Sequence, residues 1–432
     1  MKLFAVSIAT LISLVSGAGA QDRVIFIRAG KLVDVDAGRV LTDQALVVRG
    51  EMVSEIGSAS TIRVPENAET IDLTSATVLP GLIDAHVHLT LNPKSFGYEG
   101  LGWSPTRRAV YGASAARLTL EAGFTTVRNV GAAGYGAGYG DVAVRDAINE
   151  GELAGPRMMV SGPAVGITGG HCDNNLLPSE FGHHAEGVAD GPWAVRRQVR
   201  ENVKFGADLI KYCATGGVLS KGTRLGAQQY TLEEMKALVD EAHKLGLRVA
   251  AHAHGSDGIK AAIRTGVDSV EHASLLDDEA IELLLENGTV LVMDVYVSDY
   301  ILESGAEAGV LQESLNKERE VGQKQRESFR RAHDAGVTIV FGSDAGVYPH
   351  GSNGRQFAYM VRYGMSPMEA IQSATIRAAE LLGLADKVGS LSVGRYADII
   401  AVEGDPLDDV REMESVDFVM KGGTVYVDEL RP

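Results

Sequence analysis

Short apolar runs alternate with amphipathic stretches through the middle of the chain. Between residues 81 and 386, eight apolar or β-branched runs have the length of strands, and stretches with helical periodicity, such as 232–244 and 278–286, separate most of them. The predicted strands are residues 81–89, 125–130, 157–161, 209–214, 248–254, 269–273, 289–294 and 338–343. This α/β alternation predicts a (β/α)₈ TIM barrel over residues 81–386, with an open doubly wound sheet as the alternative.

Both ends of the chain have a different pattern, in which short β-rich runs are broken by glycine and aspartate. Such runs occur at residues 24–27 and 45–48, and again at 397–402 and 424–427. Neither end is long enough to build a good core alone. We therefore expect residues 21–80 and 387–432 to form one small composite β-sandwich beside the barrel.

The first twenty residues have the pattern of a secretory signal peptide. Lys2 supplies a positive start, residues 3–15 are an apolar run, and Ala18, Gly19 and Ala20 are small. The apolar run is short for a membrane span. We expect cleavage before Gln21 and export to the periplasm or the exterior, without a stable membrane anchor.

Composition narrows the class of protein further. The chain has 432 residues, of which 45% are hydrophobic and 22% are charged, as in globular proteins. Its net charge of −17 argues against binding to nucleic acid. Two cysteines can form one disulfide at most, so the fold of a chain of this size cannot depend on a disulfide framework. Cys172 and Cys213 could pair in an oxidising compartment, but we expect two separate side chains.

Histidine or aspartate ends four of the predicted strands. The histidines of the first and fifth strands come in pairs two residues apart, so both members of a pair leave the same face of the strand. Because the carboxyl ends of barrel strands meet at one face, and because imidazole and carboxylate bind divalent cations, the pattern predicts a metal site. Hydrogen-bonded core histidines are the alternative. The residues are His86, His88, His252, His254, His272 and Asp344.

Lys211, near the end of the fourth predicted strand, is an unusual residue for such a site. A buried ammonium facing a cation would be repelled and costly to desolvate. A neutral lysine amine can instead react with carbon dioxide to form a carbamate, whose two oxygens can bridge two metals. A lysine paired with a carboxylate such as Asp344 is the alternative.

Together these segments resemble the metal-dependent amidohydrolase superfamily. The chain is most similar to the imidazolonepropionase-related branch, which includes exported Xaa-Pro and Xaa-Arg/Lys dipeptidases and ochratoxinase-like carboxypeptidases. The resemblance covers nearly the whole chain after the first twenty residues, including residues 389–400. It is carried by PGLIDAHVH (80–88), IK (210–211), AHAHG (251–255), EHA (271–273) and GSDAG (342–346).

The resemblance implies two divalent metal ions, with zinc as the leading candidate and manganese, cobalt or iron also fitting. His86, His88 and Asp344 would bind one ion. His252 and His272 would bind the other, and carboxylated Lys211 would bridge the two. His254 also fits the strand-five position. We prefer His252, which aligns best with the family, and leave His254 for substrate.

The resemblance also implies roles in the reaction. Asp344 would take a proton from the attacking water and deliver it to the leaving amine, and His171 would stabilise the oxyanion. Tyr230 would hold the terminal carboxylate of the substrate, and Arg224 could also pair with that carboxylate. An ordinary packed or solvated side chain is the alternative for each of the three loop residues.

These expectations lead to one preferred function. It is a binuclear amidohydrolase that cleaves the C–N amide bond of N-acyl amino acids or dipeptides, with ochratoxin A as one candidate substrate. A mononuclear cyclic amidase or deaminase would usually have His-x-x-Glu at strand five and no strand-four lysine. A non-catalytic barrel scaffold would have lost metal ligands. We expect a small-molecule substrate and, by analogy with relatives, a homo-oligomer such as an octamer.

Overall fold

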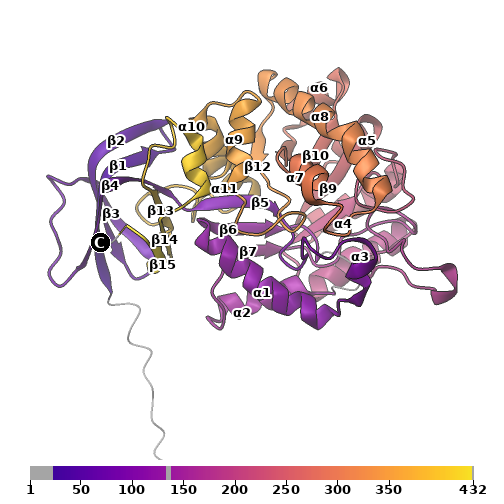
Figure 1. Ribbon diagram of the computed structural model, residues 1–432, viewed down its shortest axis with the longest axis horizontal. Coiled ribbons are helices and arrows are strands. Elements are labelled where there is room, and N and C mark those ends of the chain that lie inside the picture. Colours follow the sequence, from indigo (N-terminus) through magenta and orange to yellow (C-terminus); the bar gives the residue numbers. More distant parts are fainter. Residues whose placement is uncertain (1–22, 133–137, 431–432) are drawn as a thin grey trace, which may run out of the picture.

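The computed structural model describes residues 23–132 and 138–430, so the predicted signal peptide lies outside the described residues. The chain forms a barrel of strands and helices, and a sheet made from both ends of the chain lies beside it (Figure 1).

Eight parallel strands form the predicted barrel and correspond to the eight predicted segments. They hydrogen bond in two groups, in the orders β5-β6-β7 and β8-β9-β10-β11-β12. Val165 pairs with Tyr212 of β8 on one side, and Val87 of β5 pairs with Ala345 on the other. The ring therefore closes, which confirms a TIM barrel over an open sheet. The strands are β5 (Leu82–Val87), β6 (Phe124–Asn129), β7 (Arg157–Val160), β8 (Leu209–Cys213), β9 (Arg248–Gly255), β10 (Ser269–Leu275), β11 (Val290–Met293) and β12 (Ile339–Phe341).

Helices lie outside the strands, and local sequence signals set several of their ends. Thr231 and Glu234 form a capping box at the start of α4, which spans the predicted residues. Gly288, with φ of 64°, ends α6. The helices are α1 (Pro105–Glu121), α2 (Gly140–Asn149), α3 (Pro192–Lys204), α4 (Leu232–Lys244), α5 (Ser256–Arg264), α6 (Asp278–Asn287), α7 (Val297–Ser304), α8 (Gln312–Asp334), α9 (Arg355–Arg362), α10 (Pro367–Ser373) and α11 (Ile376–Leu382), with 3₁₀ turns η1 (Gly97–Gly102), η2 (Ser179–Phe181) and η3 (Val410–Glu414).

The two ends of the chain share one seven-stranded sheet, as the sequence predicts. Its order is β15-β14-β13-β4-β1-β2-β3. Apolar side chains from both ends, including Ile25, Ile71, Ile399 and Phe418, pack in one cluster. The strands are β1 (Val24–Asp34), β2 (Arg39–Arg49), β3 (Met52–Ser58), β4 (Glu69–Pro80), β13 (Ile399–Val402), β14 (Phe418–Lys421) and β15 (Thr424–Asp428).

The sheet is attached to the barrel by direct contacts. β4 runs into β5 through Gly81, where a side chain would come within 2.2 Å of Thr125 Oγ1, so only glycine fits. Arg157 of β7 forms an ion pair with the buried Asp398, and Lys421 of β14 donates to the Gly155 carbonyl. The contact at Gly81 lies at the start of β5, which carries the first histidine, and the other two contacts hold the start of β7.

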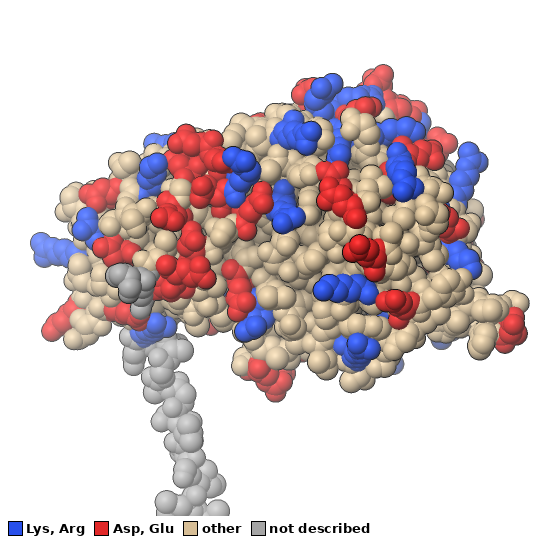
Figure 2. All heavy atoms as spheres, in the orientation of Figure 1, with Lys and Arg blue, Asp and Glu red and all other residues tan. Residues whose placement is uncertain are grey.

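Acidic side chains gather over the terminal sheet on the face shown in Figure 2, whereas lysine and arginine are scattered among them. This distribution agrees with the net charge of −17. None of the helices among the described residues has both the length and the apolar character needed to cross a membrane.

Candidate active site

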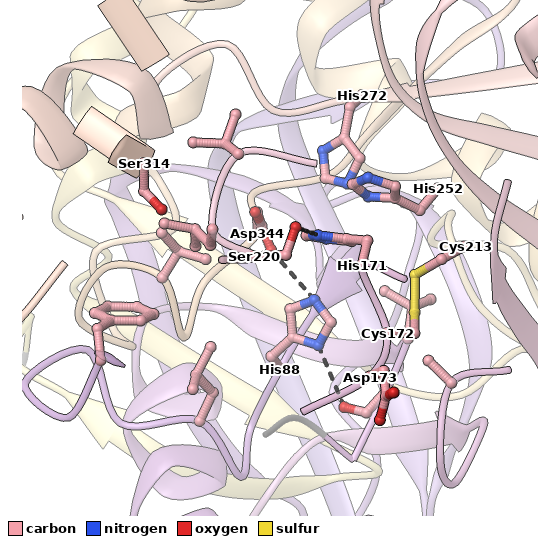
Figure 3. A pocket seen from close by; sticks show the side chains of 18 of the residues that line it. His88, His171, Cys172, Asp173, Cys213, Ser220, His252, His272, Ser314 and Asp344 are labelled. Carbon is pink, nitrogen blue, oxygen red and sulfur yellow. Dashed lines mark hydrogen bonds and ion pairs between the residues drawn. A yellow bond between two sulfur atoms is a disulfide. The ribbon is translucent and has the colours of Figure 1, made fainter. Parts of the chain in front are cut away.

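The polar residues at the ends of the barrel strands converge on one cavity of about 250 Å³ (Figure 3). Histidine rings surround its floor, with centroids of neighbouring rings 4.1–5.3 Å apart. Since these residues lie far apart in the sequence, the closed barrel is what assembles them. The cavity is lined by His88, His171, Lys211, His252, His254, His272 and Asp344, and His86 lies below it in contact with His88 and His272.

His86, His88 and Asp344 form one group of potential metal ligands. His86 Nδ1 donates to Glu271 Oε2 at 2.8 Å, and His88 Nδ1 donates to the Gly131 carbonyl at 3.2 Å. Both partners only accept, so each Nδ1 carries the proton and each Nε2 presents a lone pair. Asp344 Oδ1 lies 3.5 Å from His86 Nε2 and 3.3 Å from His88 Nε2. Ligands of a tetrahedral metal ion are separated by about this distance.

A second group lies on the other side of Asp344. His272 Nδ1 donates to Asp294 Oδ1 at 2.8 Å, which directs His272 Nε2 away from Asp294. The donor atoms of His272, Asp294 and Asp344 lie within 4.8 Å of one another. Burial lowers the pKa of His272, but the Asp294 carboxylate outweighs it and raises the pKa overall, so a metal would compete with a proton there.

The two histidines of β9 differ in their hydrogen bonding. His252 is buried, and its Nε2 has no hydrogen-bond partner among the described residues, as is also true of His86 Nε2. His254 Nδ1 is 2.7 Å from Ser274 Oγ. Burial lowers the pKa of His86, His252 and His254, which keeps their imidazoles neutral. A neutral buried nitrogen without a partner is unfavourable, and coordination of a cation would satisfy it.

Lys211 extends from β8 into the same cavity and is 3% exposed. Burial lowers its pKa to about 8, although Glu271 and Asp344 act in the opposite direction. No hydrogen bond or ion pair holds its ammonium group within residues 23–132 and 138–430, so the alternative of a lysine paired with Asp344 is not what the structure shows. An amine of lowered pKa is more often neutral and therefore nucleophilic near neutral pH.

The backbone is strained where two of the ligands leave their strands. His272, Ala273 and Asp344 have φ of 69°, 47° and 59°, in the left-handed region that side chains with a Cβ rarely occupy. Such strain persists only where the surrounding structure holds it, and it concentrates at functional sites. Here it turns His272 and Asp344 toward the cavity.

Buried polar contacts beneath the cavity fix the histidines. Arg128 Nη2 donates to both oxygens of Glu271 at 2.8 and 2.9 Å, so Glu271 holds a cation as well as His86. Asp84 accepts from Asn353 Nδ2 at 2.8 Å and from the Ser343 backbone at 3.1 Å, which ties β5 to the segment that carries Asp344. A site on strands linked in this way is rigid.

His171 lies on the long loop after β7, with its ring stacked on His252 at a centroid distance of 4.1 Å. Burial, followed by the neighbouring charges of His272 and Lys211, lowers its pKa to about 3, so the ring is neutral. Its Nδ1 lies 2.8 Å from Ser220 Oγ. Gly217 makes room for it, because a Cβ there would lie 2.4 Å from the ring.

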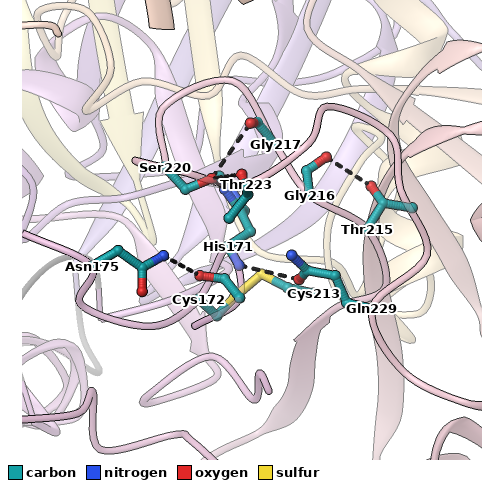
Figure 4. Close-up of a disulfide and its surroundings, with 11 residues drawn as sticks. His171, Cys172, Asn175, Cys213, Thr215, Gly216, Gly217, Ser220, Thr223 and Gln229 are labelled. Atoms are coloured by element: carbon teal, nitrogen blue, oxygen red, sulfur yellow. Dashed lines mark hydrogen bonds between the residues drawn. A yellow bond between two sulfur atoms is a disulfide. The ribbon is translucent and has the colours of Figure 1, made fainter. Parts of the chain in front are cut away.

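Cys172 and Cys213 form a disulfide beside His171 (Figure 4), so the expectation of two separate side chains is wrong. The sequence places the cysteines 41 residues apart. The loop returns over β8, where the Cys213 amide donates to the Val165 carbonyl at 2.9 Å. This pairing brings Cys172 next to the end of β8, a contact that cannot be read from residue spacing.

The structure does not bring Tyr230 and Arg224 to the cavity. The Tyr230 hydroxyl donates to the Ala189 carbonyl at 2.8 Å, and its ring is buried near Tyr212. Arg224 is exposed. Neither residue lines the cavity, so the role in carboxylate binding expected for them has no support in the geometry. Tyr230 follows a turn that directs its ring into the layer between barrel and helices.

Two functional residues were not singled out from the sequence. Asp294 follows β11 and supports His272, and the signal that found the other ligands, an acidic or histidine residue at a strand end, applies to it as well. Gln325 of α8 donates to Asp294 Oδ1 at 3.1 Å. No sequence pattern distinguishes Gln325 from other polar positions of that helix.

Comparisons with known proteins agree with this geometry. The family model described as "Amidohydrolase family" matches residues 77–426. The ochratoxinase of Aspergillus niger is 35% identical over 437 residues, covering 96% of this chain and 88% of the relative. The imidazolonepropionase of Caldanaerobacter subterraneus is 26% identical, covering 78% and 79%. A solved Xaa-Pro dipeptidase with methionine bound in its active site is 39% identical, with a TM-score of 0.84 and coverage of 94% and 100%.

The chain therefore belongs to the amidohydrolase family of metal-dependent hydrolases. Within this family it is an enzyme that acts on amide bonds, in the branch that includes ochratoxinase, Xaa-Pro dipeptidase and imidazolonepropionase. The unsatisfied histidine nitrogens around Asp344 fit the metal dependence of the family.

Proposed function

We propose that the protein is a binuclear amidohydrolase that releases a C-terminal amino acid from N-acyl amino acids or dipeptides. One observation carries the proposal. Histidine side chains with fixed tautomers surround Asp344, and Lys211 lies in the same cavity without a hydrogen bond or close ion pair among the described residues. A site for a single ion would leave Lys211 without a role.

Two ligand sets follow from this arrangement. His86, His88 and Asp344 would hold one ion, and His252 and His272 would hold the other. Lys211, as a carbamate, would lie between them and exchange its repulsive positive charge for a negative one. Zinc suits the nitrogen and oxygen donors, as do manganese, cobalt and iron. When bound, such ions supply a water of lowered pKa and polarise the amide carbonyl.

Asp344 is placed to move the proton that the reaction transfers. Burial raises the pKa of Asp344, but contact with His88 and the positive charges of His272 and Lys211 lower it overall. Its carboxylate can therefore accept a proton from the attacking water. It then gives that proton to the amine nitrogen, which leaves poorly without it.

His171 would stabilise the oxyanion. If the Ser220 hydroxyl donates to Nδ1, the neutral ring carries its proton on Nε2 and can donate it to the carbonyl oxygen as negative charge develops. Since its pKa is lowered to about 3, the ring is neutral near neutral pH.

The cavity suits a small substrate with an apolar part. Its upper wall is formed by Leu91, Phe96, Ile301, Val310 and Leu311. The ochratoxinase and Xaa-Pro dipeptidase relatives support cleavage next to a C-terminal amino acid. We propose a hydrophobic or proline leaving residue, with ochratoxin A among the candidates.

The test is a panel of dipeptides and N-acyl amino acids that differ in the C-terminal residue, assayed for release of the free amino acid by the metal-loaded enzyme. We expect turnover of substrates with phenylalanine or proline at the C-terminus. Turnover confined to cyclic amides or aminated rings would instead assign the enzyme to the imidazolonepropionase type.

We also propose that the protein is exported. The pattern of residues 1–20 supports this proposal, and a disulfide is suited to an oxidising compartment. Sequencing the N-terminus of the protein recovered from outside the cytoplasm should give Gln21 as the first residue. Retention of Met1 or Lys2 in that fraction would contradict it.

A further inference from the structure

One face of helix α8 lines the cavity and has no role in the proposed chemistry beyond Gln325. Ser314, Glu318, Val321 and Gln325 recur at intervals of four, three and four residues, so they share one side of the helix. All four line the cavity and are 1–4% exposed. Ser314 lies across the cavity from His252 in Figure 3.

Ser314 presents an unsatisfied polar atom to the cavity. Its Oγ is buried and has no hydrogen-bond partner among the described residues. A buried hydroxyl without a partner is unfavourable, so the atom is suited to a ligand that brings its own hydrogen bond.

Glu318, one turn further along the helix, presents a carboxyl group that forms no ion pair with another described residue. Ser298 Oγ donates to its Oε1. The nearby cations of α8 are committed elsewhere, because Arg326 pairs with Asp299 at 2.6 Å and Lys317 donates to the Ser220 carbonyl at 2.6 Å. Burial raises the pKa of Glu318 to about 7, and the negative charge of Asp294 adds to this effect, against the hydrogen bond from Ser298 and the more distant charges of Arg326 and His272. A cationic partner would relieve this cost.

We propose that Ser314 and Glu318 bind the free α-ammonium group of a dipeptide substrate. An ammonium has three donors and no acceptor, which complements a hydroxyl oxygen and a carboxylate. A substrate carboxylate would be repelled here by Glu318 and Asp294. Apolar Val321 and Ile301 line the same cavity, and the exclusion of water by such walls strengthens the ion pair.

The proposal rests on the proposed function and narrows its substrate class. Among compounds with a scissile amide next to a C-terminal amino acid, those with a free amino group are the better substrates. Simple N-acyl amino acids lack the cation that Glu318 would pair with.

The test compares alanyl-phenylalanine with N-propionyl-phenylalanine, which differ only in the ammonium group. The measured quantity is the ratio of their kcat/KM values for metal-loaded enzyme. We expect the wild-type ratio to favour the dipeptide by about tenfold or more, and Glu318→Gln to reduce that ratio by about tenfold, as for the loss of a charge-assisted hydrogen bond. Ser314→Ala should reduce it by about two- to fivefold.

Glu320→Gln is the matched control, since it removes the same charge from an exposed position of the same helix and should leave the ratio unchanged. A wild-type ratio near one would overturn the proposal, as would a ratio that neither Glu318→Gln nor Ser314→Ala changes. If Glu318→Gln does not fold, the wild-type ratio and Ser314→Ala still decide. Hydrolysis of neither compound, nor of any member of the wider panel, would overturn the proposed function as well.

Discussion

At the scale of single residues, the hydrogen-bond partners of the histidines occupy one ring nitrogen and leave the other nitrogen free to bind a metal ion. Acceptor-only partners fix the tautomers of His86, His88 and His272, and the Nε2 atoms of His86 and His88 lie within 3.5 Å of Asp344 Oδ1. Lys211 is the exception, because its amine forms no hydrogen bond or close ion pair among the described residues, although Glu271 and Asp344 favour its charged form. Its conversion to a carbamate would turn the least favourable group in the site into a ligand.

Replacing Lys211 by alanine should remove the bridging group. We expect the metal content to fall and kcat to drop by more than about 100-fold, beyond the range typical of residues that act through a ligand. Short carboxylic acids such as propionate should restore part of the activity, because they can occupy the vacated space with a carboxylate.

Lys421→Ala is the control for this variant. Lys421 is a half-buried lysine whose pKa burial also lowers to about 8, but it lies on β14 and does not line the cavity. We expect its metal content to stay normal and carboxylic acids to have no effect. Full activity of Lys211→Ala without added acid would exclude the carbamate.

Replacing Asp294 by asparagine should weaken one metal position. The carboxylate holds His272 Nδ1 at 2.8 Å, and asparagine loses the charge that favours this orientation. We expect the affinity for one of the two ions to fall by about 10–100-fold, measured by competition with a chelator. Asp299→Asn, which affects the pair with Arg326 instead, should retain both ions. Equal weakening of both ions in Asp294→Asn would contradict separate ligand sets.

At the scale of elements, strands and the residues that follow them carry the proposed metal ligands, whereas a loop carries His171. That loop is held to β8 by the Cys172–Cys213 disulfide and to the next loop by the contact between His171 and Ser220. The strands do not depend on this attachment. Metal binding and the position of His171 can therefore be separated experimentally.

Reduction of the disulfide should lower kcat several-fold and leave the metal content unchanged. The Cys172→Ser/Cys213→Ser variant should behave in the same way, and a reducing agent should not affect it further. Opening a link across 41 residues should also lower the stability, by about 4 kcal/mol in the loop-closure account. Unchanged kcat after complete reduction would show that the disulfide does not position His171.

Helix α8 should make a pH-dependent contribution to stability through Glu318. Its pKa is raised from 4.5 to about 7 by burial, so the folded state binds more protons than the unfolded state between these values. Stability is therefore lost as the pH rises through this window. At pH 8 the free energy of unfolding of Glu318→Gln should exceed that of the wild type by about 3 kcal/mol at most. At pH 4 the variant should show no such gain. An equal effect at both pH values in thermal unfolding would contradict the shift.

Local patterns predicted much of the fold and of the candidate metal site. Strands, HxH pairs and polar residues at strand ends can each be recognised from a few neighbouring residues of the sequence. The eight strands and α4 are of this kind. Such local signals could not predict the position of Tyr230 or the pairing of the two cysteines. Both depend on the paths of the long loops after β7 and β8, which the sequence does not show locally. Glu318 and Ser314 lie on an amphipathic helix whose rotation about its axis only the assembled barrel sets.

At the scale of the whole molecule, the terminal sheet and the barrel are joined by direct contacts and together position the strands that carry the site. The sheet joins both ends of the chain, and it contacts β5 through Gly81 and β7 through the Arg157–Asp398 pair. β5 delivers His86 and His88, and β12 is followed by Asp344 beside them. The first proposed metal position would therefore lie where the closing strands of the barrel meet.

The most direct test of this account is the metal-to-chain ratio of the purified wild-type enzyme, measured by elemental analysis after removal of loosely bound ions. The two ligand groups around Asp344, joined through Lys211, predict two ions per chain. A ratio of one in fully active enzyme would contradict the binuclear centre.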